Sequence, residues 1–259
     1  IMKESKSLIG AIFLLFLMLW LPIGQHHFLV DHWMKIGTYA VPFILIGVFI
    51  FNGPVSIGTL FKAYRFIAVI MLIAYIMHQF EEHWIDLFGN SYAFYDFNNN
   101  FILRILGATD ATVKPLTKTS IFIINTSLVW LVGVLGILAS PRHLFPLVCM
   151  ASIVIVNALV HILAAIFAFQ YNPGLLTSIF VFVPLYFWFL RFMLGHGKQI
   201  LKLIIGGLIW ALLAHVVMVA GLLIVNWYNL FPEVVYFVAL VIWSVLPLGF
   251  FRLNHQISK

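Results

Sequence analysis

Three side chains that could bind a metal ion lie within one turn of a predicted helix, in the segment His78-Gln79-Phe80-Glu81-Glu82-His83. His78, Glu81 and Glu82 are related as i, i+3 and i+4, so in a helix they share one face. One imidazole and two carboxylates are nitrogen and oxygen ligands of the kind that divalent metals take in proteins. Two adjacent carboxylates in an apolar helix are costly unless they are paired, protonated or bound to a cation. The alternative is a solvated turn, with both glutamates in water at the helix end.

A second polar pair interrupts an aliphatic run further along the chain. Asn157 and His161 are related as i and i+4 and therefore also share a helix face. Asn125 and His215 are further polar side chains in apolar runs. A lone histidine or asparagine of this kind is often a hydrogen-bonding partner between membrane helices, which is the alternative for Asn125 and His215.

Together these residues predict a divalent metal centre, with zinc as the first expectation and iron as the variant, since two histidines and a carboxylate suit either ion. The predicted ligands are His78, Glu81, Glu82, Asn157 and His161. One glutamate would bind the ion and the other would act as general base on a bound water. We expect Asn125 and His215 to lie behind the ligands and hold them in place.

The elements that position these residues follow from the composition. The chain has 259 residues, of which 64% are hydrophobic and only 8% charged. A soluble domain carries about a quarter charged residues, so lipid must be the solvent for much of this surface. Unbroken apolar runs of about 20 residues are the length of a helix that crosses a bilayer. We therefore predict an all-α, polytopic transmembrane helical bundle that forms a single domain over residues 1–259.

About eight spans are expected, and seven if the shortest of them, 37–53, does not cross fully. The predicted spans are 7–24, 37–53, 64–83, 119–139, 144–168, 175–194, 203–226 and 234–251. We expect the first of these to be an uncleaved helix rather than a signal peptide, because no small-residue cleavage site follows it.

The basic residues predict the orientation of the bundle. With both termini inside, the inner segments carry ten basic residues: Lys3, Lys6, Lys62, Arg65, Arg142, Arg191, Lys198, Lys202, Arg252 and Lys259. The outer segments carry four: Lys35, Arg104, Lys114 and Lys118. This asymmetry favours N- and C-termini inside. The net charge of +6 therefore reflects topology, and we expect no nucleic-acid partner.

Counting residues from the inner basic residue of each helix tests whether the polar groups can meet. At a rise of about 1.5 Å per residue, His78 lies about 20 Å above Arg65 and Asn157 about 22 Å above Arg142. By the same count, His215 lies about 20 Å above Lys202. The groups lie at one level, so we expect a site in the outer half of the bilayer.

The long outer loop 84–118 is rich in aromatic residues, which a disordered linker would not be. We predict a short amphipathic helix near 99–107 that lies on the outer interface. It could act as a lid over the site, or the loop could simply be packed.

Other kinds of chemistry lack their signatures. Cys149 is the only cysteine, so an intramolecular disulfide and a thiolate metal cluster are excluded. The sequence has no glycine-rich phosphate loop, no His-Glu-x-x-His motif and no Gly-x-Ser-x-Gly elbow.

The run from His78 to Glu82 resembles the signature of the HXXEE-motif membrane proteins. The pair Asn157 and His161 is similar to the second, Asn-x-x-x-His motif of that family, and Asn125 also fits. The segment Tyr171-Asn172-Pro173-Gly174-Leu175-Leu176-Thr177 resembles its Tyr-x-Pro-Gly turn. The resemblance covers about residues 60–190. It implies a multi-spanning protein of the bacterial cytoplasmic membrane and a suspected enzyme, with Tyr171 and Thr177 beside the site, but it supplies no reaction.

Three functions are compatible with these residues. The first is a metal-dependent membrane hydrolase that acts through a metal-activated water on an amphiphilic substrate, such as a lipid or isoprenoid. The second is a transporter or a proton or ion pathway, where buried glutamate and histidine are equally expected. The third is a binding or structural protein in which the polar cluster only fixes helix packing. The sequence does not predict an oligomeric state.

Overall fold

The computed structural model describes residues 26–52, 56–60, 62–105, 107, 114–140, 142–195 and 199–250. The predicted span 7–24 and both chain ends lie outside these residues. Within them the protein is all-α, and the one β-type contact is an isolated bridge between Ile85 and Ser91. Helices α2, α3, α4 and α5 run over His26–Asn52, Ile57–Leu60, Tyr64–His83 and Ala93–Ile105. The later helices are α6 (Lys118–Ile123), α7 (Leu131–Ala139), α8 (Phe145–Ala168), α9 (Leu175–Thr177), α10 (Val183–Leu194), α11 (Gln199–Leu222) and α12 (Glu233–Val245).

Four short segments continue these helices with a different hydrogen-bond pattern. Three are π-helical: η1 (Ile124–Trp130), η2 (Ser178–Phe182) and η3 (Leu223–Trp227). The fourth, η4 (Leu246–Leu248), is a 3₁₀ turn after α12. π-Helical turns are rare and frequently occur at functional sites.

Six helices in the described part of the chain are long and apolar enough to cross a membrane: His27–Ile50, Tyr64–His83, Lys118–Ala139, Phe145–Ala168, Leu175–Leu194 and Gln199–Trp227. Five of them match predicted spans to within a few residues. The predicted span 37–53 is part of the longer helix α2, which starts at His26. The last predicted span corresponds to the shorter apolar helix Glu233–Leu248.

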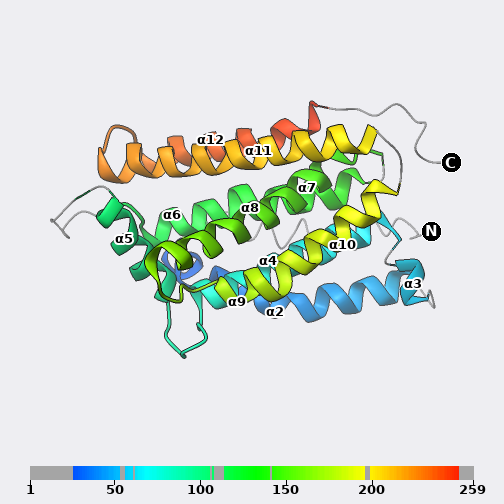
Figure 1. Ribbon diagram of the computed structural model, residues 1–259, viewed down its shortest axis with the longest axis horizontal. Coiled ribbons are helices and arrows are strands. Elements are labelled where there is room, and N and C mark those ends of the chain that lie inside the picture. Colours follow the sequence, from blue (N-terminus) through cyan, green and yellow to red (C-terminus); the bar gives the residue numbers. More distant parts are fainter. Residues whose placement is uncertain are drawn as a thin grey trace.

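The long helices run side by side along the longest axis of the molecule, and α5 lies across one end of the bundle (Figure 1). That end is called the α5 end below. Helix α4, helix α8 and the continuous helix Lys118–Ala139 form the buried middle. Helix α2 packs on α4, and α11 packs on α8.

The outer helices expose large apolar side chains. Phe43 of α2 is 75% exposed, Phe180 of η2 is 71% and Val216 of α11 is 62%. Apolar surfaces of this extent are rare on soluble monomers, and they suit a lipid environment. The composition and the helix lengths are therefore compatible with a multi-pass membrane protein.

The loop after α4 contains a helix, but α5 begins at Ala93, earlier than the predicted start near 99. Asn99 of α5 is 3% exposed and holds this helix in place. Its amide accepts a hydrogen bond from the Leu116 backbone N–H (2.9 Å) and donates one to the Leu116 carbonyl (3.0 Å). The Tyr92 hydroxyl donates to the carbonyl of Asp31 in α2. Hydrogen bonds thus hold the loop to Leu116 and to α2. Apolar periodicity alone did not predict these contacts.

Candidate metal centre

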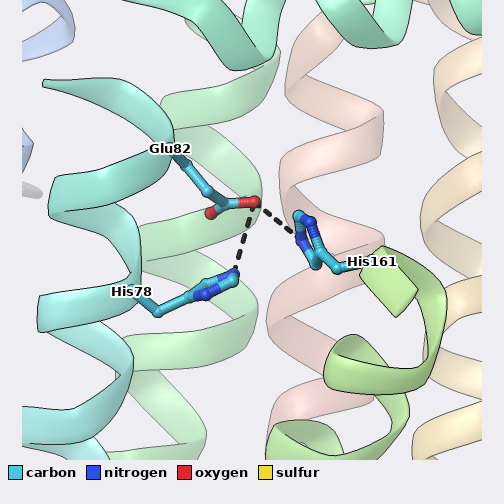
Figure 2. A group of neighbouring side chains, drawn as sticks. All are labelled: His78, Glu82 and His161. Carbon is cyan, nitrogen blue, oxygen red and sulfur yellow. Dashed lines mark ion pairs between the residues drawn. The ribbon is translucent and has the colours of Figure 1, made fainter. Parts of the chain in front are cut away.

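Two helices at the α5 end bring three possible metal ligands together. His78 and Glu82 lie one turn apart near the end of α4, and His161 faces them from α8. Their side chains point toward one another between the two helices (Figure 2). Exposed fractions of 0% for His78, 5% for Glu82 and 4% for His161 place the cluster in the interior.

The spacing of the three groups fits a small divalent ion. Glu82 Oε1 lies 3.4 Å from His78 Nε2 and 3.1 Å from His161 Nε2. One ligand atom from each residue can be chosen so that all three lie within 4.8 Å of one another. Two ligands on a tetrahedral zinc ion lie about 3.3 Å apart, because each is about 2.0–2.1 Å from the metal. The residues present therefore fit such an ion.

The Thr177 hydroxyl determines which nitrogen of His78 carries the proton. Thr177 Oγ1 donates its one proton to Glu81 Oε2, at 2.6 Å. The same oxygen lies 2.7 Å from His78 Nδ1, so it accepts a hydrogen bond from the Nδ1–H. His78 in its neutral form then carries a lone pair on Nε2, and Asn157 Nδ2 donates to it at 2.8 Å. A metal ligand needs that lone pair.

Asn172 gives His161 the same tautomer. The Asn172 amide nitrogen donates to the carbonyl of His161 (2.9 Å), which directs its oxygen toward the ring. That oxygen lies 2.7 Å from His161 Nδ1 and accepts its proton. The lone pair of His161 is therefore also on Nε2, the atom that faces Glu82.

This arrangement requires a cation. Two Nε2 lone pairs and an ionised carboxylate face one point in a buried space, where like partial charges repel strongly. In the described part of the chain the ion-pair partners of Glu82 are all histidines. The repulsion can be removed by a proton, on an imidazole or on the carboxylate, or by a metal ion, and the spacing suits each.

Glu81 does not face this point. Its Oε1 accepts hydrogen bonds from the Tyr171 hydroxyl (2.9 Å) and the Leu176 N–H (3.1 Å). Its Oε2 accepts from the N–H (2.8 Å) and the hydroxyl (2.6 Å) of Thr177. A carboxylate is thus bound to the first turn of the helix Leu175–Leu194, where free backbone N–H groups favour an anion. The sequence left open which glutamate joins the histidines, and the geometry places Glu82 there.

Tyr171 stays a hydrogen-bond donor to Glu81. Burial raises the pKa of its phenol, the Leu87 N–H that it accepts opposes this, and the Glu81 carboxylate raises the pKa further. The phenol is therefore protonated at any ordinary pH. Tyr171 joins the loop after α4 to the glutamate that anchors α9.

Gly174 closes one side of the cluster. Its φ of +94° is in the region that glycine adopts most readily. A Cβ at this position would lie 2.7 Å from Cε1 of both His78 and His161, and 3.0 Å from Glu82 Cγ. The turn before α9 therefore packs bare backbone against the three side chains.

The other predicted residues, Asn157, Asn125 and His215, differ in whether they contact the cluster. Asn157, which is half-buried, contacts the cluster through His78. Asn125 accepts from Gln79 and lies 3.4 Å from His83, so it reaches the cluster only through a residue that was not predicted. His215 Nδ1 donates to the Ala211 carbonyl of its own helix at 2.8 Å, and no hydrogen bond or ion pair found among the described residues joins it to the cluster.

Sequence reasoning missed His83 and Asn172. His83 Nε2 lies 3.3 Å from Glu82 Oε2, although adjacent residues on a helix do not normally face each other. Asn172 lies in a turn, where no helical spacing relates it to His161. The signal for Asn172 was its place in the quoted Tyr-x-Pro-Gly segment.

A separate cavity of about 570 Å³ adjoins the cluster from the side of α2. Its walls are mostly apolar and include Thr38, Ile76, Phe80 and Leu176. Glu81 and Thr177 also line it, whereas His78, Glu82 and His161 do not. The cavity therefore meets the cluster at the hydrogen bonds that hold His78.

Comparison with known proteins identifies the motif but indicates no function. Residues 69–189 match a family model described as a protein of unknown function with an HXXEE motif. This confirms the resemblance that was predicted from His78, Glu81 and Glu82. No curated protein matches the chain. No solved structure matches it either.

Proposed function

Because residues 69–189 match the HXXEE-motif family and the motif's His78 and Glu82 meet His161, we propose that the protein is a metal-dependent intramembrane enzyme, most simply a hydrolase. His78 Nε2, His161 Nε2 and Glu82 Oε1 would bind one divalent ion. Three protein ligands with an open fourth position are the pattern of catalytic rather than structural zinc. Zinc is our first choice, and iron(II) suits the same two histidines and carboxylate.

The observation that carries this proposal is the agreement between spacing and protonation. Both imidazoles are held with a lone pair on Nε2, and both Nε2 atoms lie 3.1–3.4 Å from one carboxylate oxygen. With one imidazole protonated, the same contacts would form an ion pair that fixes helix packing, so the metal content of the protein separates the two functions. A divalent ion would lower the pKa of a bound water to about 7 and so supply a nucleophile.

The chain's own residues would prepare this site in three ways. Thr177 and Asn172 hold the two imidazoles in orientation. Glu81 holds Thr177, and its four hydrogen bonds leave it poorly placed for the general-base role expected from the sequence. The half-buried Asn157 amide would turn from His78 Nε2 when a metal binds, offering its oxygen to the ion or to the reacting group.

An amphiphilic substrate, such as a lipid or isoprenoid, suits the surroundings. The cluster lies inside a bundle whose outer surface is apolar, and the neighbouring cavity has apolar walls and a size typical of small-molecule sites. We propose the bilayer as the medium from which the substrate comes and the bacterial cytoplasmic membrane, with both termini inside, as the location. No nucleic-acid partner is proposed.

A transport or proton pathway is less favoured. A pathway needs ionisable groups along its length. Among the described residues, the buried aspartate, glutamate and histidine side chains are His78, Glu81, Glu82, His83, Asp86 and His161. All six belong to one cluster and its adjoining loop, at the α5 end.

Elemental analysis tests the proposal. The full chain, purified in detergent, should carry about one divalent ion, and Glu82→Ala and His161→Ala should lose it. His32→Ala, on α2, is a matched control, because the ring contact found for His32 is with Phe28. The loaded protein should then release water-soluble product from vesicles containing phospholipid or isoprenyl diphosphate, and Glu82→Ala should not. A wild type that folds but takes up no metal would end the proposal.

A further inference from the structure

His83, the last residue of α4, is buried beside the cluster but is not one of the predicted metal ligands. It is 1% exposed. Its ring packs between Trp33 of α2, at 5.3 Å between centroids, and Phe94 of α5, at 4.9 Å. A histidine enclosed by two aromatic rings has few partners for its nitrogens, so each contact that it makes is informative.

The contact of interest is with the second oxygen of Glu82. His83 Nε2 lies 3.3 Å from Glu82 Oε2. The other oxygen, Oε1, is the one that faces His78 and His161. The two ends of this carboxylate therefore have different neighbours.

The proton of neutral His83 belongs on Nε2. A carboxylate can only accept hydrogen bonds, so an Nε2–H is the group that bonds to Oε2. His83 Nδ1 is buried and has no hydrogen-bond partner among the described residues. An unpaired buried acceptor is less unusual than an unpaired buried N–H, which also favours the proton on Nε2.

A chain of hydrogen bonds that starts in the π-helical segment η1 ends beside the His83 ring. The Trp130 indole N–H donates to Gln79 (2.7 Å), and the Gln79 amide nitrogen donates to Asn125 (2.8 Å). An indole nitrogen only donates, so it fixes the orientation of both amides. Asn125 Nδ2 then donates to the Ile121 carbonyl (2.9 Å). The same nitrogen lies 3.4 Å from His83 Nε2. Both atoms are donors when Nε2 carries the proton, so Asn125 then packs against the ring without a hydrogen bond to it.

We infer that His83 is a positioning residue of the metal centre, which holds Glu82 Oε2 by a hydrogen bond and so turns Oε1 toward the two histidine ligands. The inference rests on the proposed function, since it concerns the same ion. Carboxylates that bind metals are themselves hydrogen-bonded, and loss of such an outer partner typically weakens binding 10- to 100-fold.

The test uses two substitutions that differ in hydrogen bonding. His83→Gln keeps an N–H donor near Glu82, and His83→Leu fills the same space without one. Zn²⁺ affinity of the detergent-purified full chain is measured by chelator competition, with thermal unfolding as the control for folding. We expect His83→Leu to bind zinc about 10- to 100-fold more weakly at unchanged stoichiometry, and His83→Gln to recover most of the loss.

Cobalt substitution separates positioning from direct ligation. In the Co²⁺ form, the visible absorption of His83→Leu should keep the wild-type band pattern, because the same atoms bind the ion. A band pattern that shows one nitrogen ligand fewer would make His83 a ligand and overturn the inference. Equal zinc affinity in the wild type and His83→Leu would also overturn it, while leaving the proposed function intact. A wild type without metal removes the proposed function itself and the inference with it.

Discussion

The carboxylate of Glu81 and residue Thr177 are joined twice, since Oε2 accepts both the backbone N–H and the hydroxyl of Thr177, at 2.8 and 2.6 Å. The same hydroxyl accepts the Nδ1 proton of His78. The residues of the motif therefore have different roles, which the order of the residues in the sequence does not reveal. His78 and Glu82 face the proposed ion, whereas Glu81 holds the neighbouring helix and, through Thr177, the orientation of His78.

Exchanging the two glutamates for glutamine should therefore give opposite results. Glu82→Gln should lose the metal and keep most of the stability of the fold. Glu81→Gln places an N–H₂ group among four donors, and should lower the free energy of unfolding by about 1–3 kcal/mol while the ion still binds. Metal content and thermal unfolding of the two variants, measured side by side, check this; metal loss in both with equal stability would contradict it.

Removing only the Thr177 hydroxyl tests the tie to His78. Thr177→Val has nearly the same shape and leaves the His78 Nδ1–H without an acceptor, so metal affinity should fall by about tenfold or more. Thr177→Ser keeps the hydroxyl and should bind like the wild type. Chelator competition measures both, and equal affinities for Val and Ser would show that the hydroxyl does not support the site.

Gly174→Ala should destroy the site by geometry alone. A methyl group there would overlap both imidazoles, and φ of +94° is strained for any other residue. We expect a loss of about 2–4 kcal/mol in the free energy of unfolding, with loss of metal. The matched control is Gly58→Ala in α3, where a Cβ would meet nothing within 4 Å. That variant should retain wild-type stability and metal; if both variants behave alike, the contact at Gly174 is unimportant.

Much of the fold could be predicted because lipid leaves hydropathy as the dominant signal. The predicted span 144–168 matches α8 to one residue. Helix α2 was predicted too short, since Asp31, His32 and Lys35 interrupt its apolar run. In the structure two of these charges have partners, because Asp31 pairs with Lys118 (3.0 Å) and Lys35 lies over the Trp84 ring (5.3 Å). Such tertiary contacts carry no local sequence pattern.

The site was predictable to the level of a helix face and no further. The i+3 and i+4 positions lie on the same face, so spacing could not separate Glu81 from Glu82. Their different roles come from the turn before α9 and the start of that helix, which donate hydrogen bonds to Glu81 but only pack backbone against Glu82. The role of His83 could not be predicted from the sequence, because its contact with Glu82 depends on side-chain direction at the helix end.

Acid should release the ion. Both imidazoles and the carboxylate must be deprotonated to bind a metal, so binding competes with protons and weakens as pH falls. We expect the loaded protein to keep its ion near pH 7.5 and to lose it progressively below about pH 6, since histidine has an ordinary pKa of about 6.5. Equilibrium dialysis against buffers of decreasing pH measures the loss. An ion content that does not change down to about pH 4 would argue against histidine ligands.

Phe94 of α5 should control access to the cluster. Its ring makes edge-to-face contact with His83, at 4.9 Å between centroids, and lies 5.9 Å from the His161 ring. The sequence suggested a lid in this loop, and these contacts make Phe94 the side chain through which α5 would act. Phe94→Ala should speed extraction of the ion by a chelator about tenfold, as expected when a gate opens, with a much smaller change in affinity.

Phe101→Ala is the matched control on the same helix, because the Phe101 ring stacks on Phe97, at 6.0 Å. Stopped-flow measurement of extraction should find the control at the wild-type rate; equal acceleration in both variants would mean that α5 is merely loosened, and no acceleration in Phe94→Ala would mean that the ion leaves by another route.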